Sequence, residues 1–333
     1  MKVLNNKFLK AVIGMIAFAL LFAFSAAAQN PATGQLEEKE IPLSEFNALN
    51  VEDDFEVTVC QGAYGIRLTV DTDLAPYIEK YVKAKTLYIS YDEKSVPKDV
   101  KKLYKGKGAQ IPVFRVVVYV PTLESITLSD NVSLTGTDPF LSGKFELELK
   151  DKAQVKMLNV SAQTAKIAMR RNTQAVLNLT TERGIEVAAE GNANLKLTMD
   201  AKELVVKASN SAVVAASGKA RNVSVDSGSS SQLNLSTQSD RVDINAEGSS
   251  KLILAGEGAE MKLKASRSAN LEAVNFRCQT LDADLSGSAV ANVDVVREIK
   301  VCLVGGSALY YSGTPSFRIE KIVKSTLAPI GTK

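Results

Sequence analysis

Apolar and polar side chains alternate along most of this chain, and the alternating pattern recurs at a nearly constant interval. In Ile185–Leu197 the odd positions are apolar or small and the even positions are mostly polar, with Gly191 between the two halves. A period of two is the pattern of a β-strand with one buried face. The central glycine predicts a corner that divides the repeat into two short strands. The same pattern begins again at Leu204, Val242 and Leu281.

Ten repeats align on the first inward residue after each corner. The spacing between neighbouring aligned positions is nearly constant, and it is 19 residues from Ala193 to Ala212 and from Ser231 to Ser250. Seven of the ten corner residues, which stand two positions earlier, are Gly, Asn or Asp, and these types tolerate a left-handed backbone. The expected corner residues are Asp130, Asp151, Thr173, Gly191, Asn210, Ser229, Gly248, Arg267, Gly287 and Gly305. The expected inward residues are Val132, Ala153, Ala175, Ala193, Ala212, Ser231, Ser250, Ala269, Ala289 and Ser307.

A fixed period with a constant inward phase predicts an all-β chain that folds as a single-stranded β-solenoid, or β-helix, right-handed by analogy. Each coil of a solenoid buries its apolar face only by stacking on its neighbours. No Phe, Tyr or Trp occurs from Glu146 to Asn275, which fits a lumen too narrow for rings. The alternative is a β-sandwich or a set of meanders, but hairpin loops of varied length would not keep a constant period.

The segment before the repeats has a different composition. Residues 43–123 also alternate but hold most of the aromatic side chains, so we expect a bulkier β-region that caps the solenoid. Within it, Leu74–Lys83 predicts a short helix or helical turn. The solenoid of about ten coils is expected over residues 124–313. Residues 314–333 are expected to cap the other end, where Tyr310, Tyr311 and Phe317 lie.

The N-terminal segment, residues 1–28, has the order of a secretory signal peptide. Lys2, Lys7 and Lys10 precede the unbroken apolar run Ala11–Phe24, and then the small residues at positions 25–28. We expect cleavage after Ala28, a linker over 29–42 and an exported protein of the periplasm or cell surface. The alternative is an uncleaved membrane anchor. No later stretch is apolar for long enough to cross a bilayer, so no transmembrane segment is expected in the mature chain.

Removal of the signal peptide also changes the charge. The chain has 40 Lys and Arg against 37 Asp and Glu, and losing the three signal lysines leaves 37 of each sign. A neutral chain lacks the basic surface that nucleic-acid binding requires. Cys60, Cys278 and Cys302 allow either a single Cys278–Cys302 bridge or three free thiols, and no C-x-x-C redox motif occurs.

Candidate chemistry is sparse. The chain contains no histidine, which excludes Ser-His-Asp triads and His-based zinc sites, and it has no phosphate-binding loop. We therefore expect no enzyme, cofactor or metal. Asp282 and Asp284 are expected to point outward from one strand, and Asp226, Asp243 and Asp294 could join acidic ladders between coils. Solvated side chains are the simplest interpretation of them, with a weak cation site or glycosidic catalysis as alternatives.

One segment stands out by charge. Glu93–Lys107 holds six lysines and two acids and falls between predicted strands, so it is expected to be an inserted loop or short helix. It is either a docking patch for an acidic partner or anionic glycan, or simply a solvated loop. The candidate patch is Lys94, Lys98, Lys101, Lys102, Tyr104, Lys105 and Lys107.

Several segments resemble a known family. Phe46–Gly62, Val118–Ser129, the small-residue corners and Leu309–Pro315 are similar to the auto-transporter adhesin head GIN domain family of Bacteroidetes-type exported proteins. The resemblance spans about residues 43–316. It implies a β-solenoid with a role in adhesion, whose partner would be a cell-envelope component, a glycan or another protein.

Three functions follow from these expectations. The first is a non-enzymatic, adhesin-like binding protein that presents a rigid solenoid surface. The alternatives are a structural envelope protein that self-associates and, less favoured without histidine, a polysaccharide-active β-helix enzyme.

Overall fold

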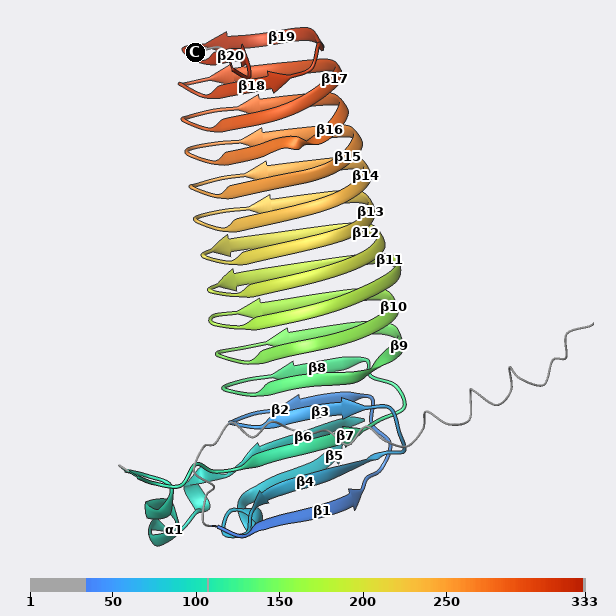
Figure 1. Ribbon diagram of the computed structural model, residues 1–333, viewed down its shortest axis with the longest axis vertical. Coiled ribbons are helices and arrows are strands. Elements are labelled where there is room, and N and C mark those ends of the chain that lie inside the picture. The colour runs from blue at the N-terminus through green and yellow to red at the C-terminus, as the bar shows by residue number, and fades with distance from the viewer. Residues whose placement is uncertain (1–33, 107, 332–333) are drawn as a thin grey trace, which may run out of the picture.

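A computed structural model describes residues 34–106 and 108–331, so the expected signal peptide and Lys107 lie outside the described residues. The described chain forms one 20-stranded sheet that winds into a long stack of parallel strands (Figure 1). The predicted solenoid is confirmed.

Nine long strands build the regular part of the stack, and each makes almost a full coil. Each pairs in parallel with the strand before and after it, and in the middle of the stack the offset between paired residues is constant, as in Asn194↔Val213↔Gln232. The strands are β9 (Ser133–Leu149), β10 (Gln154–Arg170), β11 (Gln174–Gly191), β12 (Asn194–Asn210), β13 (Val213–Ser227), β14 (Gln232–Ala246), β15 (Lys251–Ala265), β16 (Asn270–Leu285) and β17 (Val290–Val304).

Each coil has a tight corner at one edge and a wider bend at the other (Figure 1). We call the segments between corner and bend the first face, and the segments between bend and next corner the second face. Nine of the ten expected corner residues have a positive φ, for example Asn210 at 61° and Gly248 at 73°.

The exception is a correction to the register. The third corner is Arg171, with φ 67°, while Thr173 is fully buried as the first inward residue in place of Ala175. Thr173 and Ala175 both point inward, so a period of two could not separate them, and arginine gives no compositional sign of a left-handed corner.

The lumen between the two faces is filled by stacked rows of aliphatic side chains. On the second face, Val206, Val225, Ile244 and Leu263 occupy one row, and each is at most 3% exposed. Because strands of neighbouring coils lie about 4.8 Å apart, each row is a continuous column of contacts along the solenoid. These columns hold the coils in one register.

The parallel stack extends below residue 124. Strands β2 (Ala48–Val51) and β3 (Glu56–Cys60) pair in parallel with β8 (Ser125–Leu128) and β9. Beneath them, β6 (Thr86–Tyr91) and β7 (Phe114–Tyr119) pair with β2 and β3. The chain therefore forms two coils, out of sequence order, before the regular repeats begin.

Antiparallel strands close the N-terminal end. On the first face, β1 (Leu36–Pro42) pairs with β4 (Gly65–Asp71), which pairs with β7; on the second face, β5 (Ile78–Lys83) pairs with β6. Residues 36–42, expected to be linker, thus form a strand. Of the short helix or helical turn expected at 74–83, the turn is present as η1 (Ala75–Tyr77), and the residues after it form a strand because their alternating side chains pack as one.

At the C-terminal end the first face continues from β17 through β18 (Ala308–Ser312) to β20 (Thr326–Pro329). The second face continues only through β19 (Ser316–Val323). The first face therefore ends one strand later than the second face.

Candidate binding surface

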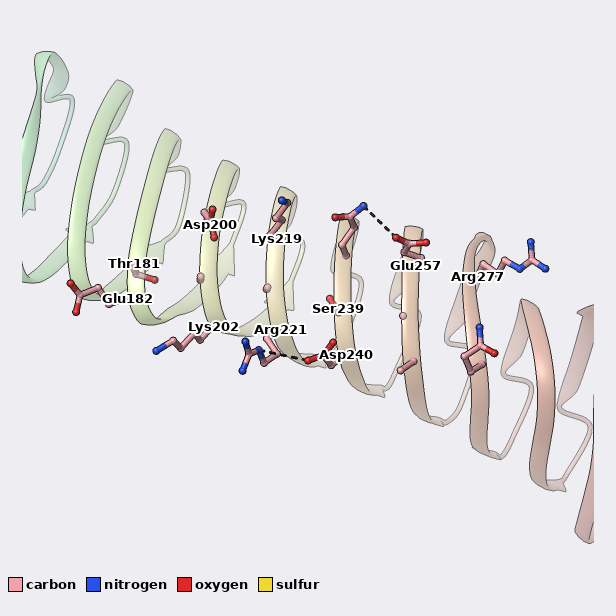
Figure 2. A pocket seen from close by; sticks show the side chains of 16 residues that line it. Thr181, Glu182, Asp200, Lys202, Lys219, Arg221, Ser239, Asp240, Glu257 and Arg277 are labelled. Atoms are coloured by element: carbon pink, nitrogen blue, oxygen red, sulfur yellow. Dashed lines mark hydrogen bonds and ion pairs between the residues drawn. The ribbon is translucent and has the colours of Figure 1, made fainter.

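A groove runs along the bend edge of the solenoid across six coils, from β11 to β16 (Figure 2). We call it the bend groove, and its volume is about 810 Å³. Its floor is one small residue on each of the five strands from β11 to β15, of which Ala201 and Ala220 are directly paired, as are Ser239 and Gly258. Thr181, Ala201 and Ala220 are buried with their side chains toward the lumen, so the groove is the strip of strand between two rows of long outward side chains. The floor residues are Thr181, Ala201, Ala220, Ser239 and Gly258.

The first wall of the groove is a single row of directly paired residues. Its exposed side chains change sign along the axis: Asp200, Lys219, Gln238, Glu257 and Arg277. Successive side chains start about 4.8 Å apart, the spacing between coils. The amide of Gln238 donates to Oε1 of Glu257 over 3.4 Å, so part of this wall is already ordered.

The opposite wall carries Glu182, Lys202, Arg221 and Asp240, one per coil. Nε of Arg221 lies 3.6 Å from Oδ2 of Asp240, and both side chains are well exposed. Exposed pairs of this kind contribute little to stability, so they can exchange partners for a ligand at small cost. The two walls offer donors and acceptors at every coil without a net charge of one sign.

The groove carries carboxylates on both walls, Asp200 and Glu257 on the first and Glu182 and Asp240 on the other. Within residues 34–106 and 108–331, no three side chains of Asp, Glu or Cys gather as a metal site. Oppositely charged or neutral residues separate the carboxylates of the first wall, Asp200 and Glu257. A paired-carboxylate arrangement for glycoside cleavage would need two such groups on either side of one bond.

The insertion that carries the predicted lysine patch lies at the corner edge of the stack, opposite the bend edge (Figure 1). Between β6 and β7, where other coils have a tight corner, the chain inserts η2 (Glu93–Ser95) and α1 (Lys98–Leu103). This agrees with the expected insertion. The side chains of Lys94, Lys98 and Lys102 are exposed.

Lys105 and Tyr104 hold the insertion in place. Nζ of Lys105 lies 2.7 Å from Oε1 of Glu93, a contact that lowers the pKa of Glu93. Tyr104 packs against the core with its hydroxyl buried, and burial raises its pKa to about 12. Lys101 is half-buried. Only part of the candidate patch is therefore available to an acidic partner.

An acid-lined hollow of about 350 Å³ lies behind the insertion, and no sequence motif predicted it. Stacking of the coils brings Asp53, Asp54 and Asp130 beside Glu93, Lys101 and Lys105. Burial, then the neighbouring carboxylates Asp130 and Asp54, raise the pKa of Asp53, against the backbone N–H of Tyr91, which lowers it. The corner edge is thus a surface of mixed charge.

The suggested acidic ladders do not form. Along one row of the second face, Asp243 and Asp282 alternate with Lys262 and Lys300. Nζ of Lys300 lies 3.2 Å from Oδ2 of Asp282 and 3.3 Å from Oε1 of Glu320, and these two contacts raise the pKa of Lys300. Alternation of sign satisfies the carboxylates within the sheet, so the expected solvated surface fits them better than a cation site.

All three cysteines are free. The Cys278 thiol lies in the lumen at the bend, whereas Cys302 is on the outer side of the second face. The Cys278–Cys302 bridge that the sequence allowed is therefore not formed.

Fold and surface together define a class: a long parallel β-solenoid with a charged axial groove. Within that class, the sequence matches the family model described as "Putative auto-transporter adhesin, head GIN domain" over residues 45–184, 177–237 and 221–315. These matches cover most of the chain, and the protein belongs to this family, DUF2807.

Solved structures of low sequence identity are similar over most of their length. A putative adhesin from Parabacteroides merdae is 16% identical, with 90% of this chain and 98% of that chain covered and a TM-score of 0.33. A putative adhesin from Parabacteroides distasonis is 17% identical, with 90% and 99% covered and a TM-score of 0.34. A putative lipid binding protein from the same species is 16% identical, with 90% and 98% covered and a TM-score of 0.30.

No curated protein shows significant similarity to the chain. In the part of the chain that the structure describes, no helix has the length and apolar character needed to cross a membrane.

Proposed function

We propose that this protein is an exported, non-enzymatic, adhesin-like binding protein whose bend groove holds an extended glycan chain of the cell envelope. The observation that carries the proposal is the continuity of the groove over six coils. Five successive coils repeat a small floor residue between the two walls, so a linear polymer can make similar contacts at successive coils. The family description as an adhesin supports a binding role.

The walls suit a hydroxyl-rich partner. A sugar hydroxyl both donates and accepts hydrogen bonds, and carboxylate, amide and ammonium groups alternate along the wall from Asp200 to Arg277. The rigidity of the solenoid also favours binding, because a preformed row of side chains loses little conformational entropy when a ligand binds.

A glycan array with the exported protein tests this function. The groove variant Lys219→Glu/Arg221→Glu reverses charge on both walls of one coil and should weaken binding by about tenfold or more. The matched control is Lys196→Glu/Lys251→Glu, at exposed first-face positions of β12 and β15 whose paired neighbours are uncharged. Ala259→Trp, at an exposed residue of the groove, should block the groove without reversing charge. Equal binding by the wild type, both groove variants and the control would refute the proposal.

The lysine patch remains a prediction that the same array can address. A variant with Lys98, Lys101, Lys102 and Lys105 changed to Gln should lose binding to anionic glycans only. If it binds all glycans as the wild type does, the patch has no docking role. Shortened glycans in the incubated samples would contradict the non-enzymatic assignment.

A further inference from the structure

The two ends of the solenoid are finished differently. At the N-terminal end, the lumen is filled by buried rings such as Phe55 and Phe114 and covered by antiparallel edge strands. At the C-terminal end, Phe317 and Ile319 of β19 continue the lumen rows of Ile299 and Val301. Phe317 is 38% exposed and Ile319 57%, whereas the residues beneath them are fully buried. Within the described residues, the lumen is therefore closed at the N-terminal end and open at the C-terminal end.

The backbone at the C-terminal end is also open. Among the described strands, β19 pairs only with β17, and β20 pairs only with β18, so β19 and Thr326–Ala328 of β20 each have one free edge. A free strand edge beside exposed apolar side chains is a template for strand pairing. Ile322, Val323 and Ile330 add to the exposed apolar surface at this end.

We infer that a second copy of this chain covers the open end, so that two solenoids join C-terminal end to C-terminal end. The C-terminal end is stepped, because the first face extends one strand beyond the second. This step determines how the two copies are oriented relative to each other. A copy related by a two-fold axis parallel to the strands brings its longer face over the shorter face of its neighbour. In each copy β19 then pairs antiparallel with β20 of the other.

Other arrangements leave gaps. A two-fold axis along the sheet normal would place β20 against β20 and leave about 4.8 Å, the width of one strand, unfilled between the two copies of β19. Head-to-tail stacking would need an open N-terminal lumen, and that end is closed. Its edge strand β1 presents mostly charged side chains, Glu37, Glu38, Lys39 and Glu40, with Leu36 as its one exposed large apolar residue.

The interface is self-complementary, as a two-fold dimer requires. Ile319 and Ile322 of one copy meet Leu327 of the other, because Leu327 faces the lumen above Leu309. Pro329 lacks a backbone donor, so pairing through β20 is confined to Thr326–Ala328. Arg318, Lys321 and Lys324 make this end basic, so added salt should tighten the dimer by screening repulsion.

The dimer places the two bend grooves in line. A two-fold axis parallel to the strands keeps the bend edge of both copies on the same side, so the grooves follow one another along a common axis. This consequence rests on the proposed function, whereas the dimer does not. A polymer that spans both grooves would bind with the gain of a bivalent contact.

Sedimentation equilibrium on protein purified from cells that express the full chain tests the dimer. The wild type should approach twice the mass of one chain as concentration rises. Ile319→Lys should stay at the mass of one chain, because a charge would enter the buried interface. The matched control is Ile253→Lys, which changes a residue 50% exposed on the first face of β15 and should leave the dimer intact. Circular dichroism establishes that both variants are folded.

Hydrogen exchange provides a second measurement. Amides of β19 and β20 should gain protection with protein concentration, while those of β1 should not. The dimer is refuted by a wild type that stays monomeric at all concentrations, by a dimer that survives Ile319→Lys, or by assemblies that grow beyond two chains. Protection of β19 in a monomer would also refute it, since something else would cover the end.

Discussion

At the scale of single residues, glycines decide how large side chains fit into the lumen near the bend. Gly256 has φ 116°, and a Cβ there would overlap the carbonyl oxygen of Thr237 in the coil below. The ring of Phe276 lies over Gly258, where a Cβ would come within 2.7 Å of Cζ. The ring of Phe276 fits into the narrow lumen because Gly258, the residue beneath it, has no side chain.

Gly256→Ala should lower the free energy of unfolding by about 2–4 kcal/mol, since both the positive φ and the contact with Thr237 are unfavourable for a side chain. Urea denaturation measures the change. Gly143→Ala is the control, because no atom lies within 4 Å of its Cβ position, and it should shift stability by less than about 0.5 kcal/mol. Equal losses in the two variants would show that close backbone approach is not the cause.

The three thiols should react at very different rates. Cys278 is fully buried, and burial raises its pKa to about 12, so almost no thiolate forms near neutral pH. Cys60 and Cys302 are partly exposed. Iodoacetamide at about pH 8, followed by mass spectrometry, should modify Cys60 and Cys302 but not Cys278 until the protein is denatured. Native labelling of Cys278 as fast as Cys302 would mean that the bend opens readily.

At the scale of elements, the corners are the most constrained part of each coil, and the one beneath the lysine insertion is also charged. Asp53 adopts φ 73°, and its Oδ2 accepts a 2.7 Å hydrogen bond from the N–H of Tyr91. Burial and nearby carboxylates raise its pKa above the value in the unfolded chain. The folded protein therefore prefers this carboxyl protonated.

Asp53→Asn should raise stability at neutral pH. The pKa of Asp53 is higher in the folded chain than in the unfolded chain, so its protonated carboxyl contributes fully to stability below the unfolded pKa. That contribution is lost as the pH rises through the folded pKa. Asparagine mimics the protonated form, still accepts from Tyr91 and tolerates a positive φ. When unfolding midpoints are measured as a function of pH, the midpoint of the variant should be higher than that of the wild type at pH 7 and equal to it in acid. Asp284→Asn, at an exposed position, should show no such trend.

At the scale of the whole molecule, stability comes from stacking of neighbouring coils. Each regular coil contacts chiefly the coils above and below it, so the stack behaves as a one-dimensional array. Because β12, β13 and β14 pair in the same register, β14 can stack directly on β12 in the way that it stacks on β13.

Deletion of residues 213–231 removes one coil and should leave a folded solenoid. Ala212 then leads into Gln232, and the register keeps Asn194 opposite Gln232 in place of Val213. The circular dichroism spectrum should keep its β shape. A deletion of residues 213–222 is the control, since it shifts the following strand out of register and should unfold or aggregate. Similar behaviour of both deletions would argue against register as the source of stability.

The coil period and the inward rows were readable from the sequence because burial imposes a period of two and stacking imposes a constant repeat. The third corner was placed at Thr173 rather than Arg171 because both inward residues after it satisfy the same alternation. The strand at 36–42 was missed because its exposed edge, with Glu37, Glu38 and Glu40, has the composition of a linker.

The sequence by itself determined the solenoid, its repeat, nine of the ten left-handed corners and the insertion at residues 93–107, because each follows from local alternation and turn chemistry. Only the tertiary structure decided which outward residues share a row, since the rows arise when neighbouring coils stack in register. The bend groove, the acid-lined hollow at Asp53 and the stepped C-terminal end are all products of that stacking. Each joins residues that are close in space but separated by at least one coil of chain.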